Sequence, residues 1–283
     1  MKYLFLTCSV IPLIFLGACA SDKKPNEEIP AKELYKQAES ALQEKQYNKA
    51  SDLFEEVERL YPYSPYATES QLKAAYSQYE NNEYEEAILS LDRFIELHPG
   101  HSQIDYAYYL KALCYYEQIA DIHRDQSVTR NALDSFNALI RRFPASKYTQ
   151  DATLKRDLTL DHLAGKEMEI GRYYLKQNQV NAAINRFLIV VRNFQTTSHV
   201  PEALHRLVEA YLTLGLKGEA TKVAAVLGHN YPGSEWYEAS YKLLDPKERE
   251  NLIKDRSLLD KSVDLLLKRD DVPQEAETEE IEE

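Results

Sequence analysis

The stretch Leu60-Tyr61-Pro62-Tyr63-Ser64-Pro65-Tyr66 decides the fold, because weaker copies of it return along the chain. Those copies are Leu97-His98-Pro99-Gly100-His101-Ser102, Arg142-Phe143-Pro144-Ala145-Ser146 and Asn230-Tyr231-Pro232-Gly233-Ser234. Each copy separates two amphipathic runs. Proline cannot continue a helix and disfavours helical backbone at the residue before it, so the motif marks where one helical unit ends and the next begins.

Between the motifs, small and large apolar residues recur at helical spacing in the tetratricopeptide repeat (TPR) pattern. In the first unit, Ala38 and Ala50 allow two antiparallel helices to approach closely, and Phe54 would fill the space between them. Further units contain Ala75, Ala87 and Leu91; Ala112, Ala132 and Phe136; Gly171, Ala183 and Phe187; and Leu204, Tyr211 and Ala220. We therefore predict an all-α fold, a TPR solenoid of about five helix pairs.

The spacing of the motifs predicts where a repeat departs from the common length. Pro62 and Pro99 are 37 positions apart, whereas Pro99 and Pro144 are 45 apart. The extra residues of the third unit fall in a polar stretch near residues 121–127. We expect a loop between the two helices of that unit.

The fourth unit is longer still. Pro144 and Gln195, which stands where the next proline would be, are 51 positions apart. This unit has either a long first helix or an additional helix before it, over about residues 148–176. That segment would join an N-terminal group of three repeats at 31–145 to a C-terminal pair at 146–233.

The repeats are followed by signals for capping helices over residues 234–269. Ser234 precedes one short helix, and Asp245 is placed as the N-cap of another. Terminal repeats of a solenoid need such a cover. Residues 270–283 contain eight acidic side chains and no basic one, which predicts a disordered acidic tail.

The N-terminus reads as a lipoprotein signal peptide over residues 1–18. Its apolar run is shorter than the roughly 20 residues needed to span a bilayer. The string Leu16-Gly17-Ala18-Cys19 resembles a bacterial lipobox, which makes Cys19 the lipid-attachment residue, and Ala20 after it favours the outer membrane. An ordinary secretory signal and a short anchor helix are the alternatives. Residues 19–30 would form a flexible tether.

Composition argues against several classes of function. Formal net charge is −12, most of it in the tail, and a mildly acidic body makes non-specific nucleic-acid binding unfavourable. His98 and His101 flank a turn and have no further ligand at a suitable spacing, so we predict no metal and no cofactor. Cys114 lies in an aromatic helical run and is expected to be buried. Nothing in the sequence indicates a catalytic site.

A binding surface is the remaining candidate. In a TPR array the first helix of each pair lines the concave side, and tyrosine suits recognition of an extended peptide. The expected groove residues are Tyr35, Gln43, Leu72, Tyr76, Tyr79, Tyr106, Tyr109 and Tyr116, with Tyr63 and Tyr66 of the first motif at its mouth. The alternative is that several of these side chains only pack between helices.

The repeats, the lipobox and several strings together resemble the BamD (ComL/YfiO) family of outer-membrane assembly lipoproteins, over roughly Cys19 to Pro232. The strings are Tyr61-Pro62-Tyr63-Ser64-Pro65-Tyr66, Asp92-Arg93-Phe94-Ile95, Ile104-Asp105-Tyr106-Ala107-Tyr108-Tyr109 and Pro144-Ala145-Ser146-Lys147-Tyr148-Thr149-Gln150-Asp151-Ala152. The resemblance implies a lipid-anchored subunit of the β-barrel assembly machinery on the periplasmic face of the outer membrane, with further subunits as partners.

The resemblance also implies partners for each end of the solenoid. The C-terminal repeats would dock the barrel subunit BamA, and Asn185-Arg186 occupies the place of a family contact. The N-terminal repeats would receive unfolded outer-membrane proteins. Contacts made by a longer loop in other members do not transfer to residues 121–127, and residues 236–283 extend beyond the family core.

Two other functions remain open at this point. TPR lipoproteins also serve as periplasmic adaptors that coordinate cell-wall synthesis with envelope constriction, although that class typically adds a coiled coil that this sequence lacks. A cell-wall hydrolase with a helical superstructure is the other, but the chain has no room for a catalytic domain after the repeats.

Overall fold

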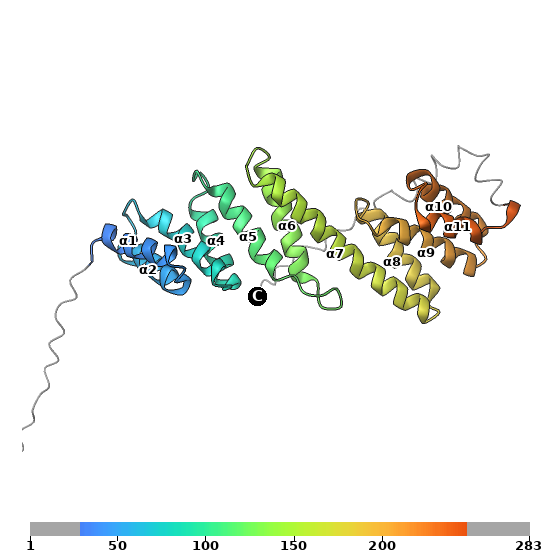
Figure 1. Cartoon of the computed structure of the whole chain (residues 1–283), viewed down its shortest axis with the longest axis horizontal. Coiled ribbons are helices and arrows are strands. Elements are labelled where there is room, and N and C mark those ends of the chain that lie inside the picture. The colour runs from blue at the N-terminus through green and yellow to red at the C-terminus, as the bar shows by residue number, and fades with distance from the viewer. Residues whose placement is uncertain (1–28, 248–283) are drawn as a thin grey trace, which may run out of the picture.

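The computed structural model describes residues 29–247, and within this range the regular structure consists of eleven α-helices. They are α1 (Ala31–Gln43), α2 (Tyr47–Leu60), α3 (Ala67–Glu80), α4 (Tyr84–Leu97), α5 (Ile104–Glu117), α6 (Ser127–Arg142), α7 (Thr149–Lys176), α8 (Val180–Asn193), α9 (Val200–Thr213), α10 (Lys217–Asn230) and α11 (Glu235–Leu243). Figure 1 shows them as one elongated row in chain order.

Each helix packs against its neighbours in the sequence, and α11 covers α9 and α10. This arrangement confirms the predicted all-α TPR solenoid of five helix pairs with a C-terminal cap. Most of the second capping helix expected after Asp245, together with the signal peptide at 1–18 and the tail at 270–283, lies outside the described residues.

The recurring motif ends helices as predicted. Helices α2, α4, α6 and α10 each end at its first residue, and the capping residues Tyr61, His98, Phe143 and Tyr231 that follow all leave the helical region of backbone space. In the fourth unit, Phe194 ends α8 in the same way although Gln195 follows it instead of proline. The aromatic or His position is therefore common to all five turns.

Small and aromatic residues hold each helix pair together. Ala38, Ala50 and Phe54 of the first pair are fully buried, as are Ala132 and Phe136 of the third. An alanine at these positions lets the helix axes approach, and the phenylalanine ring fills the remaining space. Burying one such ring contributes about 1.5–3 kcal/mol.

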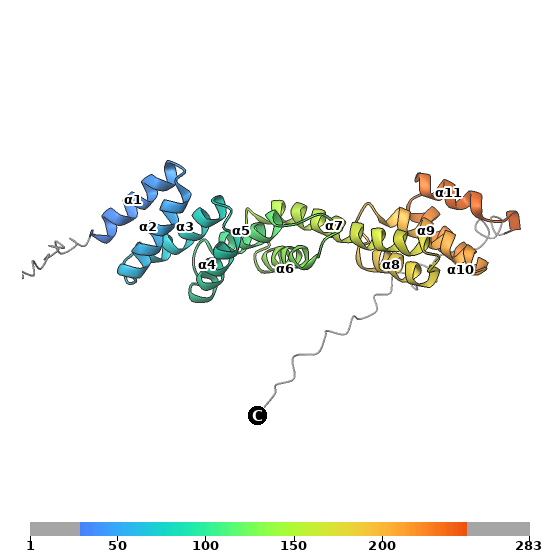
Figure 2. The same ribbon diagram turned by 90° about the horizontal axis from the view of Figure 1, so that it is seen from below.

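The long fourth unit contains one continuous helix rather than an additional one, because α7 runs unbroken for 28 residues. Ala152 near its start belongs to a core cluster with α3–α6, whereas Ala164 and Met168 belong to the cluster with α8–α11. Figure 2 shows α7 in the middle of the row between these two ends. The boundary between the groups 31–145 and 146–233 stays a prediction.

Candidate functional site

A row of tyrosines lies along α3, α5 and the start of α7. We define the tyrosine row as Tyr76, Tyr79, Tyr106, Tyr109 and Tyr148, all partly buried on the core cluster beneath them. The Tyr109 ring stacks on Tyr148 with centroids 4.8 Å apart and an interplanar angle of 15°, and the Tyr106 centroid is 5.3 Å from that of Tyr148. The row brings together side chains of two repeats and the long helix.

The phenol groups of Tyr79, Tyr106 and Tyr109 are hydrogen-bond donors at neutral pH. Burial raises the pKa of Tyr79 to about 12 and also raises the pKa of Tyr106 and Tyr109. The Tyr109 hydroxyl donates to Asp151 Oδ2 over 2.5 Å, and Lys155 Nζ donates to both oxygens of the same carboxylate. Apolar ring faces with polar tips make this surface suited to a polypeptide backbone.

Beyond the row, the structure adds an apolar stretch on α7 that sequence reasoning missed. Leu154 and Leu158, one turn apart, are 60% and 52% exposed. Leu158 also lines a pocket of about 470 Å³ with Tyr116, Ile119 and His162. The Nε2 atom of His162 is buried there and has no hydrogen-bond partner among the described residues. The sequence signal was a pair of leucines off the main apolar face of a long amphipathic helix.

Two expected groove residues, Tyr35 of the first repeat and Leu72 of the second, are placed differently. Tyr35 and Leu72 are only 7% and 3% exposed, so both side chains pack in the core rather than line an accessible surface. Tyr35 lies against Phe54 and Tyr66, with ring centroids 5.8 and 5.0 Å away. This is the packing alternative that the sequence left open.

The other groove residues expected from the sequence lie in three kinds of place: a turn, a helix end and the edge of the core. Tyr63 is fully exposed on its turn, Gln43 is exposed at the end of α1, and Tyr66 is half-buried against Tyr35. The Tyr116 ring contacts the buried Phe136 edge-on, with centroids 5.9 Å apart. Gln43, Tyr63 and Tyr66 therefore do not form one continuous surface with the tyrosine row. Tyr116 instead lines the pocket beside Leu158.

Lys73 of α3 connects the second repeat to the first. Its Nζ atom donates to the Tyr35 hydroxyl at 2.5 Å and lies 2.7 Å from Glu39 Oε1 and 3.0 Å from Glu69 Oε1. Burial alone would lower the pKa of Lys73, but the hydrogen bonds to Glu39, Tyr35 and Glu69 outweigh it and raise the pKa. The network ties α1 to α3.

The second candidate surface lies on α8. Asn185 is exposed, and Arg186 beside it is half-exposed. Arg186 Nη1 forms an ion pair with Glu167 Oε2 of α7 at 3.1 Å. The pair holds the guanidinium against the long helix while leaving part of it accessible to a partner.

A charged network on α9 lies next to the cap. His205 Nδ1 is 2.8 Å from Ser240 Oγ of α11, and Arg206 Nη1 donates to Glu209 Oε2 at 2.8 Å. The hydrogen bond from His205, together with that from Arg206, lowers the pKa of Glu209 to about 2. The contact between His205 and Ser240 joins α11 to the last repeat.

The cysteine and histidine residues that the sequence brought into question either have structural contacts or lie outside the described residues. Burial raises the pKa of the Cys114 thiol to about 12, so it remains protonated in the core. His98 Nε2 is 2.9 Å from Gln71 Oε1. Across residues 29–247, no group of three His, Cys, Asp or Glu side chains could hold a metal ion.

No helix of that range is long and apolar enough to cross a bilayer. The lipid-attachment residue Cys19 lies outside the described range.

Comparison with known proteins places the chain in a family. The YfiO family model, described as an outer membrane lipoprotein, matches residues 27–227. The chain belongs to this family. Among YfiO relatives, the outer membrane protein assembly factor BamD of Caulobacter vibrioides is 50% identical over 81% of this chain and 76% of its own length. The factor of the same name from Rickettsia prowazekii is 48% identical over 83% and 94%.

A solved structure with helical repeats is also similar. The TPR2AB domain of yeast Sti1, in a complex with pHSP90, is 12% identical with a TM-score of 0.39, covering 83% of this chain and 89% of its own.

Proposed function

We propose that this chain is a non-catalytic assembly factor for outer-membrane proteins, anchored through Cys19 to the periplasmic face of the outer membrane. In this proposal the first three repeats receive unfolded outer-membrane proteins. Asn185 and Arg186 of the last two repeats dock the barrel subunit BamA. Family membership and the names of the relatives support the general role.

The tyrosine row is the observation that carries the proposal of substrate binding. Four tyrosines of α3 and α5, together with Tyr148 directly before α7, lie partly exposed. Tyr109 contacts Asp151 of α7, and the exposed Leu154 and Leu158 follow about one and two turns later on that helix. An unfolded β-strand presents alternating apolar side chains and a backbone with unused donors and acceptors. Ring faces and leucines would take the side chains, while the phenol groups and the Asp151 carboxylate would pair with the backbone.

Replacing Leu154 and Leu158 together by serine is expected to weaken binding of such a substrate about tenfold. Both side chains are exposed, so the change removes apolar contact area without opening a cavity, and tenfold corresponds to about 1.4 kcal/mol. The measurement is fluorescence anisotropy of a labelled peptide with alternating apolar and polar residues.

The matched control for this change lies in the last repeat. Leu214 and Leu216 are 41% and 47% exposed in the turn between α9 and α10. Figure 1 shows this turn far from α5 along the solenoid. Their replacement by serine is expected to leave peptide binding unchanged. Equal losses in the two double variants would show that the binding surface is not at α7.

Depletion of the protein tests the cellular role. The expected result is a fall in outer-membrane β-barrel proteins before any change in cell division. If barrel levels held while septation or glycan cleavage failed, the chain would instead be an adaptor for cell-wall synthesis or a hydrolase, and the proposal would be wrong.

A further inference from the structure

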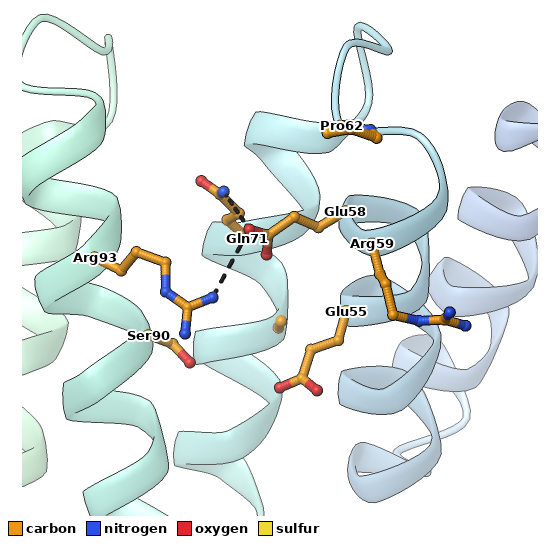
Figure 3. Close-up of a pocket in the computed structure, with 8 residues that line it drawn as sticks. Glu55, Glu58, Arg59, Pro62, Gln71, Ser90 and Arg93 are labelled. Atoms are coloured by element: carbon orange, nitrogen blue, oxygen red, sulfur yellow. Dashed lines mark hydrogen bonds and ion pairs between the residues drawn. The ribbon is translucent and has the colours of Figure 1, made fainter.

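A second pocket, of about 440 Å³, opens between α2 and α4 with α3 as its floor (Figure 3). It is lined by Glu55, Glu58, Arg59, Pro62, Gln71, Ala74, Ser90 and Arg93. Gln71 and Ala74 lie on a different face of α3 from Tyr76 and Tyr79, because each residue of a helix turns by about 100°. The pocket is therefore separate from the tyrosine row.

Polar side chains in this pocket are held in a fixed chain of contacts. His98 Nε2 is 2.9 Å from Gln71 Oε1, and Gln71 Nε2 donates to Glu58 Oε1 at 2.7 Å. Arg93 Nη1 lies 3.9 Å from the same Glu58 oxygen. Figure 3 shows Gln71 and Arg93 converging on Glu58 from α3 and α4. Glu58 is therefore already engaged on two sides.

The fold itself does not require charge at this place. The same position between the fourth and fifth repeats is a pocket of about 300 Å³. In the sequence register 133 residues further on, Glu58 corresponds to Val191, Gln71 to Leu204 and Arg93 to Val226. Valine and leucine therefore also serve at this place in the packing of one repeat on the next. The Glu58 side chain is only 26% exposed, so placing a carboxylate there costs desolvation, and a further role would explain it.

Glu55 carries the unused charge of the pocket. Its Oε1 accepts a hydrogen bond from Gln78 Nε2 at 2.8 Å, and it forms no ion pair with any described residue within 4.0 Å. Burial and the neighbouring carboxylates Asp52 and Glu58 raise the pKa of Glu55. Arg59 also lines the pocket, but its guanidinium extends away from Gln71 and Arg93 in Figure 3 and pairs with Glu56 at 3.2 Å. The pocket centre thus has an excess of negative charge.

Two buried polar side chains of α3, the helix that forms the pocket floor, also favour a ligand rich in hydrogen-bond donors. Ser70 and Gln78 are 0% and 5% exposed, and they stand one turn before and one turn after Ala74, which lines the pocket. Ser70 Oγ and Gln78 Oε1 have no hydrogen-bond partner within the described part of the chain. Of the two, Gln78 adjoins the pocket, because its amide contacts the lining residue Glu55, and its Oε1 is an acceptor that a donor-rich group could satisfy.

We propose that this pocket binds a basic side chain, arginine or lysine, of a partner polypeptide, with Glu55 as its counter-ion. An arginine presents five N–H donors and suits the free Glu55 oxygen together with the amide acceptors. Leu89 and Leu97, 68% and 57% exposed, lie one turn on either side of Arg93 on α4 and form an apolar rim for the residues that flank the basic side chain. This inference does not depend on the proposed function.

The test is a titration of the ¹⁵N-labelled full chain with N-acetyl-arginine amide, followed by NMR. We expect saturable shifts of the backbone amides of Ala74 and Ser90 at millimolar probe concentration. The variant Glu55→Gln keeps an acceptor for Gln78 but removes the charge, and should weaken binding of the probe about tenfold. Glu56→Gln, one residue away and outside the pocket, should bind the probe as the unaltered chain does.

Three results would overturn the inference. The first is an unchanged response in Glu55→Gln, and the second is the absence of saturable shifts at Ala74 and Ser90. The third is saturable binding of N-acetyl-glutamate amide at the same amides, which would assign the pocket to acidic side chains through Arg93. Melting temperatures of the variants within a degree of the unaltered chain would show that any loss of binding is not a loss of folding.

Discussion

Replacing Arg186 by alanine is expected to reduce the affinity for BamA by at least thirtyfold. Truncating one partner of a desolvated ion pair across an interface costs about 2–5 kcal/mol, and 2 kcal/mol is about thirtyfold in affinity. The measurement is equilibrium binding of purified BamA by surface plasmon resonance, supported by recovery in a pull-down.

The structure explains why this arginine suits an interface. Glu167 of α7 pairs with Arg186 at 3.1 Å, and its side chain is only 17% exposed, so the guanidinium is already oriented before a partner arrives. A carboxylate of the partner could bind the accessible nitrogens without displacing Glu167. An arginine held in this way loses less side-chain entropy on binding.

Two further variants separate docking from general charge effects. Arg156→Ala removes another arginine of similar exposure, on α7, that pairs with its neighbour Asp157 at 2.7 Å. This change should leave BamA binding intact. Arg186→Lys should recover part of the affinity, because charge is kept but the planar fork is lost. Full binding by Arg186→Ala, or an equal loss in Arg156→Ala, would contradict the assignment.

Replacing Gly171 by alanine is expected to destabilise the protein by about 1–2 kcal/mol. An added Cβ would lie 2.4 Å from Cε1 of Phe187, which is fully buried in the core between α7 and α8. Overpacking of a core costs about 1–3 kcal/mol, and the better helix propensity of alanine returns part of this. Urea unfolding followed by circular dichroism gives the free energy of unfolding.

A glycine of the next repeat provides the control for this prediction. At Gly218, near the start of α10, an added Cβ would meet no heavy atom within 4 Å. Gly218→Ala should therefore leave stability unchanged or raise it by up to about 1 kcal/mol. The two changes are chemically identical and should differ in sign. Equal free energies of unfolding would show that α7 and α8 can separate without cost.

Local sequence signals predicted the course of the helices well. The proline-containing motif and the alanine and phenylalanine positions are properties of single helix pairs, so they can be read one repeat at a time. Ala38, Ala50 and Phe54 are fully buried where the pattern places them. The sequence left only the continuity of the segment near 148–176 open, because both alternatives have the same helical periodicity.

Surface assignments were less predictable, because exposure depends on what the next repeat covers. Tyr35 and Tyr109 both lie on first helices, yet Tyr35 is buried by Phe54 and Tyr66 while Tyr109 stacks half-exposed on Tyr148. Leu154 was not predicted as a surface residue, since its exposure follows from the way α7 leaves the third repeat.

The motif at residues 60–66 shows which features the sequence determines and which depend on the tertiary structure. By itself the sequence determined that Tyr61-Pro62 ends a helix, that helices pair through small residues, and that the chain forms a TPR array, because these follow from backbone sterics and local spacing. Only the tertiary structure decided that Tyr66 packs on Tyr35 while Tyr63 stays exposed, and that Glu55 faces a pocket. Those outcomes depend on the distance and angle between successive repeats, which no single repeat encodes.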